Sequence, residues 1–81
     1  MAYVVRATHP EHGDRYKVFR ALPDARDLFE LGSGLVLRNE REAAYLYEVP
    51  GEDDARAAVE AVKVGNALIL DKFTTDELKL L

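Results

Sequence analysis

The clearest pattern of apolar and polar positions lies between residues 46 and 70. Apolar residues at its centre follow the spacing i, i+3, i+4, i+7, with which a helix packs on a sheet: Ala55, Ala58, Val59 and Val62. Residues 43–49 and 67–73, on either side of this stripe, are rich in aliphatic and aromatic side chains, which favour strands. The pattern therefore predicts a strand, a helix over residues 53–63 and a second strand, joined as a βαβ unit.

The N-terminal part of the chain predicts a β-hairpin. Residues 2–8 and 15–21 are both rich in β-branched and aromatic residues. Between them, Pro10 presets the backbone of the first turn position, and Gly13 can adopt the left-handed conformation near the end of the loop. Two strand-like segments around a loop of this kind form a hairpin.

Residues 15–31 also have a competing interpretation as one continuous helix. Four apolar residues of this segment share a helical spacing: Val18, Leu22, Ala25 and Phe29. Pro23 argues against such a helix, because it disfavours helical backbone at the preceding residue and removes an interior hydrogen bond. We expect Pro23 instead in the first turn of a short helix. The Gly-Ser-Gly at residues 32–34 ends this helix in our interpretation, and a strand follows at residues 35–38.

The order of the central unit occurs twice. Strand, proline, Asp-Ala-Arg helix, small residue and apolar strand follow one another over residues 18–37 and again over residues 46–70. Doubling a βαβ unit gives βαββαβ, the ferredoxin-like arrangement, in which right-handed crossovers place both helices on one face of the sheet. We therefore expect an α+β domain of ferredoxin-like type, with an extra N-terminal strand in a hairpin and a short C-terminal helix after residue 74.

Size and composition restrict the class of protein. The 81 residues predict a single domain over residues 1–81, whose core is thin and which no disulfide can stabilise because the chain contains no cysteine. Oligomerisation is then a common source of stability. A formal net charge of −4 disfavours binding to nucleic acid or to an anionic membrane. Without an apolar run of roughly 20 residues or a secretory signal, the chain is expected in the cytoplasm, with no membrane partner.

The strands carry apolar side chains on both faces, although the expected helices cover only one. Tyr45, Tyr47 and Val49 share one face of their strand, and Leu46 lies on the other. An uncovered apolar surface usually marks an interface. We therefore expect these three residues, with Tyr16, to bind a protein partner or a second copy of the chain in a homodimer.

An alternative cover for this face is the C-terminal segment, which contains Leu78, Leu80 and Leu81. The predicted function is a small non-enzymatic binding protein, of the inhibitor or regulatory-subunit type, that requires no cofactor. Nothing in the chain supplies a complete catalytic constellation.

Two further functions start from particular side chains. His9 and His12 lie three residues apart in a turn that also contains Asp14, so they are candidates for a metal site or for the general base of a dimeric α/β-barrel-type enzyme or small-ligand binder. No further ligand or orienting partner can be named for them. Tyr45 and Tyr47 can also stack nucleic-acid bases, but the chain lacks the clustered Lys and Arg that phosphate binding requires.

Overall fold

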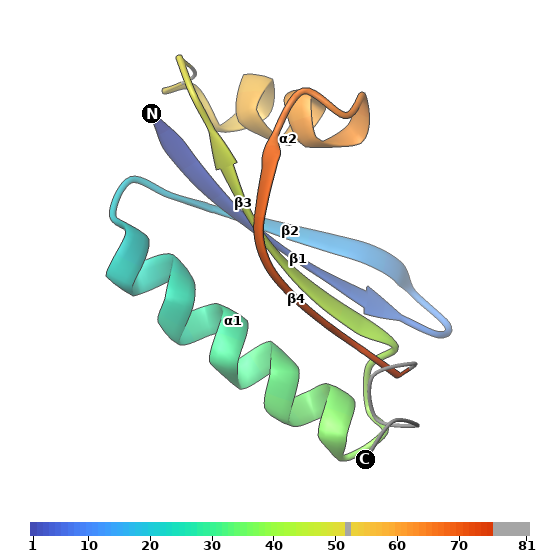
Figure 1. Cartoon of the computed structure of the whole chain (residues 1–81). Helices are drawn as coiled ribbons and strands as arrows, with labels where there is room; N and C mark the ends of the chain where they lie inside the picture. The colour runs from blue at the N-terminus through green and yellow to red at the C-terminus, as the bar shows by residue number, and fades with distance from the viewer. Residues whose placement is uncertain (52, 76–81) are drawn as a thin grey trace.

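The computed structural model describes residues 1–51 and 53–75, which form four strands and two helices (Figure 1). In chain order these elements are β1 (Ala2–His9), β2 (Gly13–Phe19), α1 (Leu22–Leu37), β3 (Ala43–Val49), α2 (Ala55–Lys63) and β4 (Leu68–Thr74). The strands form one sheet in the order β2-β1-β3-β4, and every neighbouring pair is antiparallel. The chain is therefore an α+β domain of ββαβαβ order. The predicted C-terminal helix falls on residues 76–81, which lie outside the described residues.

The N-terminal hairpin is confirmed. β1 and β2 pair from Tyr3 opposite Phe19 to His9 opposite Gly13. Gly13 has a φ of +74°, a backbone conformation that side-chain-bearing residues rarely adopt. The turn therefore uses the glycine as the sequence pattern predicts.

The prediction of two βαβ repeats is wrong, because residues 35–37 belong to α1 rather than to a strand. The buried residues of α1 continue the helical spacing through the Gly-Ser-Gly segment: Ala25, Phe29, Gly32 and Val36. Ser33 sits inside the helix and donates its hydroxyl hydrogen to the carbonyl oxygen of Phe29, at 2.9 Å. A Cβ at position 32 would lie 3.4 Å from the Cβ of Ala44. Gly32 therefore allows α1 to approach the sheet closely and does not end the helix.

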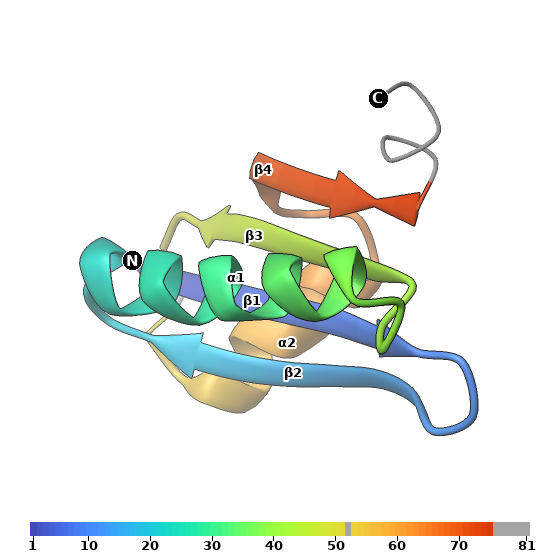
Figure 2. The same cartoon turned by 90° about the horizontal axis from the view of Figure 1, so that it is seen from below.

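The two helices cover opposite faces of the sheet, which corrects the expectation that both lie on one face. One apolar cluster joins Phe29 and Val36 of α1 to strand residues such as Leu46. A second joins Ala58 and Val62 of α2 to strand residues that include Val4. Figure 2 shows α1 in front of the sheet and α2 behind it. Each face of β1 and β3 thus has a helix to cover its apolar side chains.

The right-handed crossover rule does not determine which face α2 covers. β3 and β4 are antiparallel neighbours, so the connection between them is not a crossover between parallel strands and the right-handed rule does not apply. The helix itself forms as the sequence predicts. Asp54 accepts a hydrogen bond from the backbone N–H of Ala57 at 3.0 Å, and Lys63 lies in the last turn, where the helix dipole favours a cation.

Candidate functional site

Three of the four residues predicted for the interface, the tyrosines, lie together around Arg6. Arg6, on the central strand β1, is opposite Tyr16 of β2 and Tyr45 of β3 in the sheet register. Tyr47, two residues along β3, shares the same face, which is the face that α2 covers. We call Arg6, Tyr16, Tyr45 and Tyr47 the tyrosine cluster.

Arg6 lies across the two tyrosine rings of β3. Its guanidinium carbon is 4.1 Å from the ring centroid of Tyr45 and 5.6 Å from that of Tyr47, while the two rings are 6.0 Å apart. Such contacts are attractive because the face of an aromatic ring is electronegative. Asp14 lies 3.7 Å from the Arg6 guanidinium and accepts a hydrogen bond from Thr8 at 2.7 Å. Arg6 therefore occupies the ring faces of Tyr45 and Tyr47 that a ligand would otherwise contact.

Much of the tyrosine cluster is buried. Tyr47 is 6% exposed, and this burial raises the pKa of its hydroxyl above the ordinary value, although the charge of Arg6 acts in the opposite direction. Tyr16 and Tyr45 are half-buried. Val49 is buried against the α2 side of the sheet, so its side chain does not reach the surface. The tyrosine cluster is therefore mainly a packed layer under α2 and Arg6, with Tyr16 and Tyr45 at its exposed margin.

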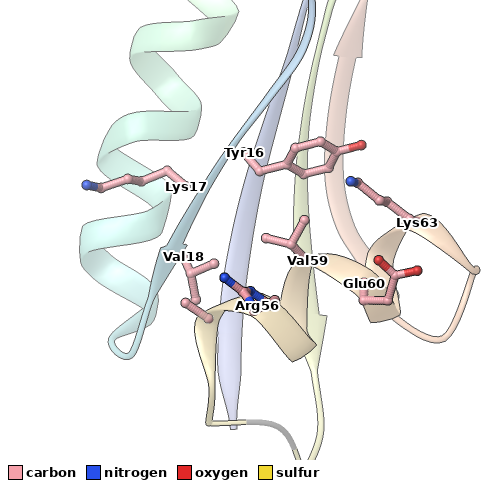
Figure 3. Close-up of a pocket in the computed structure, with 8 residues that line it drawn as sticks. Tyr16, Lys17, Val18, Arg56, Val59, Glu60 and Lys63 are labelled. Carbon is pink, nitrogen blue, oxygen red and sulfur yellow. The ribbon is translucent and has the colours of Figure 1, made fainter.

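An open hollow of about 480 Å³ adjoins this margin, between β2 and α2 (Figure 3). Tyr16, Val18 and Val59 line it, and the Lys63 ammonium is 5.5 Å from the ring centroid of Tyr16. The charged side chains around the hollow are of both signs, since Glu60 lies among the cations. The hollow does not select a ligand of one charge.

The two histidines form a structural turn. Their rings stack with centroids 4.4 Å apart. The Nδ1 atom of His9 accepts hydrogen bonds from the backbone N–H groups of Glu11, at 3.0 Å, and His12, at 3.1 Å. This nitrogen is therefore engaged in the turn rather than open to a metal. Within residues 1–51 and 53–75, no three His, Asp or Glu side chains are grouped as metal ligands would be.

We expect the His9 ring to titrate below its ordinary pKa of 6.5. The loss of solvation lowers this pKa most, followed by the charges of His12 and Arg41. Because the unfolded chain binds this proton more readily, the turn loses stability as the pH falls below 6.5. NMR titration of the His9 ring proton should give a midpoint below 6.5. A midpoint at or above that value would contradict the hydrogen-bonded turn.

Three consecutive large apolar residues of β4 are exposed. Leu68 and Ile69 are each 58% exposed and Leu70 is 38% exposed. β4 is the last strand of the sheet, so one side of its backbone has no neighbouring strand among the described residues. We call the segment Leu68–Ile69–Leu70, with this free side of the backbone, the β4 edge. The opposite edge, β2, carries Asp14, Arg15 and Lys17, charges that discourage strand pairing.

Sequence reasoning missed Arg6 and the β4 edge for different reasons. Arg6 lies two residues after Val4 on a strand, so the alternation of β1 could have placed it on the tyrosine face. The exposure of the β4 edge depends on the strand order, which is set by contacts distant in the sequence. The apolar run at residues 68–70 is visible in the sequence, but its position at the rim of the sheet is not.

Comparisons with protein-family models, with curated proteins and with solved structures give no match. Among the described residues, neither helix has the length and apolar character needed to cross a membrane. The β4 edge and the surfaces around α1 and α2 are therefore the candidate sites of function.

Proposed function

We propose that this protein is a non-enzymatic binding module that self-associates through the β4 edge. The observation that carries the proposal is the coincidence of three consecutive, exposed, large apolar side chains with a strand at the rim of the sheet. Proteins usually protect such an edge with charge, proline or a covering element. β4 has no charge, proline or covering element at Leu68, Ile69 or Leu70 in the described part of the chain. Its pairing with β3 shifts register at Leu70, and its two charged residues, Asp71 and Lys72, follow directly.

Pairing of two β4 edges satisfies both the backbone and the side chains. An antiparallel contact between identical strands is two-fold symmetric, so each copy offers the same surface and the assembly closes as a dimer. The free N–H and C=O groups of β4 then form a ladder, as in strand addition to a sheet edge. Leu68, Ile69 and Leu70 gain cross-strand contacts with the partner strand, each worth about 0.2–1 kcal/mol.

The charge of β4 also suits a second copy of this chain. Each chain has a formal net charge of −4, which opposes association at long range. β4 itself carries one acid, Asp71, and one base, Lys72, so the contacting strands are formally neutral. Asp71 is further compensated by Arg26 of α1, at 3.6 Å. Repulsion is therefore weak where the two copies meet.

The test is the effect of Ile69→Lys on the molar mass in solution. A lysine at this position places a charge in the contact and removes an apolar side chain, so the dissociation constant of the dimer should rise by about 10- to 100-fold. Sedimentation equilibrium over a range of protein concentrations measures this constant.

Leu37→Lys is the matched control, because Leu37 is 57% exposed, as Ile69 is 58% exposed, but lies at the end of α1. This variant should retain the wild-type dissociation constant. A wild-type protein that remains monomeric at every concentration would contradict self-association. In that case the β4 edge would be left as a site for a strand of another protein, with the chain acting as an inhibitor or regulatory subunit.

A further inference from the structure

An apolar slot of about 210 Å³ lies between α1 and the β1–β2 hairpin. Val5 and Ala7 line it from the sheet, and Leu28, Leu31 and Leu35 line it from α1. In Figure 2, α1 lies over the middle of the sheet and β2 runs along its side. The slot is on the face opposite α2 and contains no residue of β4, so it is independent of the proposed dimer contact.

Small residues keep the slot open. Ala7 occupies a strand position where a larger side chain would extend toward α1, since its neighbour across the sheet, Ala44, packs in the α1 cluster. Gly32 lines the slot from the helix and contributes no side chain to it. At Ala7 and Gly32, consequently, no large side chain fills the space beside the leucines of α1.

The rim of the slot is positively charged. Arg15, Lys17 and Arg41 line it, and no acidic side chain does so among the described residues. Lys17 is opposite Val5 and Arg15 is opposite Ala7 in the sheet register, so both cations lie on the face of the slot. Within residues 1–51 and 53–75, none of the three cations forms an ion pair. Arg41 also donates a hydrogen bond to the carbonyl oxygen of Glu40, at 2.7 Å, so Arg15 and Lys17 are the cations most available at the rim.

We infer that the slot binds a small amphiphile with a carboxylate head and a short apolar body. The apolar body enters between the leucines and the hairpin, where it is removed from water. The carboxylate remains at the rim, where arginine and lysine donate charge-assisted hydrogen bonds to it. Neither half of the site is sufficient alone, because the leucines do not select a charge and exposed cations do not select a shape.

Octanoate is the probe for this site, and the measurement is an NMR titration of the isotopically labelled full chain. Saturable shifts are expected in the methyl groups of Val5, Ala7 and Leu28. Octylamine has the same alkyl chain with the opposite charge and should bind at least about tenfold more weakly, because the cationic rim repels it. 1-Octanol should be intermediate. The titration is repeated with Ile69→Lys to separate slot binding from self-association.

Two variants test the two halves of the site. Arg15→Gln combined with Lys17→Gln should weaken octanoate binding about tenfold and abolish the preference over octylamine. Ala7→Leu should fill the slot and remove saturable binding of all three probes while the far-UV circular dichroism stays unchanged. The control is Lys72→Gln, which removes a cation from β4 and should bind octanoate as the wild type does.

Three results would overturn the inference. The first is the absence of saturable shifts with octanoate. The second is equal affinity for octanoate and octylamine. The third is a set of shifts confined to Leu68–Leu70, which would show that the probe binds the β4 edge instead of the slot.

Discussion

Replacing Phe29 by alanine should lower the free energy of unfolding by about 3–5 kcal/mol. Phe29 is 5% exposed at the centre of the cluster that joins α1 to the sheet, so the substitution removes a large apolar contact and leaves a cavity. A domain of 81 residues has a total stability of about 4–12 kcal/mol. The substitution should therefore remove a large share of the stability of the fold. Urea denaturation followed by circular dichroism measures the loss.

Leu37→Ala is the control for Phe29→Ala, because Leu37 lies on the same helix but is largely exposed. It should change the free energy of unfolding by less than about 1 kcal/mol. If the two variants lose equal stability, α1 does not pack on the sheet through the face that contains Phe29.

Replacing Ser33 by proline should destabilise the fold by about 3 kcal/mol or more, because a proline inside a helix removes a backbone hydrogen bond and collides with the carbonyl four residues earlier. That carbonyl belongs to Phe29, whose side chain anchors the core. The expected result distinguishes the observed helix from the turn that the Gly-Ser-Gly segment suggests, since a proline in a turn costs little. Urea denaturation again provides the measurement.

Ser33→Ala separates the effect of the proline ring from the loss of the serine hydroxyl. This variant loses only the hydrogen bond to the Phe29 carbonyl and gains helix propensity, so its stability should stay within about 1 kcal/mol of the wild type. A Ser33→Pro protein as stable as Ser33→Ala would show that α1 ends before residue 33.

The elements that local signals define could be predicted from the sequence. The β1–β2 hairpin follows from Pro10 and Gly13 between two strand-forming segments, and α2 follows from its apolar stripe and its N-terminal aspartate. β3 has the predicted bounds. Each of these depends on residues close together in the chain, so no knowledge of tertiary contacts was needed.

The end of α1 could not be predicted because glycine has two opposite uses. A Gly-Ser-Gly segment ends many helices, but glycine also permits a helix to lie close to a sheet. Gly32 lies inside α1, where an added Cβ would meet Ala44, twelve residues away, at 3.4 Å. That misassignment produced the apparent internal repeat and, with it, the expectation that both helices lie on one face.

The candidate site was predicted in part. The shared face of Tyr45 and Tyr47 follows from strand periodicity, and their proximity to Tyr16 follows from the pairing of both strands with β1. Their burial does not, because α2 crosses to the tyrosine face and Arg6 covers two of the rings. The surface proposed for self-association consequently moves from the face of the sheet to the β4 edge, while the proposed class of function stays the same.

Hydrogen exchange at the β4 backbone tests the central claim most directly. If two copies pair through the β4 edge, the amide groups on the free side of β4 become hydrogen-bonded in the dimer, so their exchange should slow as the protein concentration rises. The β2 amides on the opposite edge of the sheet should exchange at the same rate at every concentration. Exchange at β4 that is independent of concentration, or that slows equally at β2, would contradict self-association through the β4 edge.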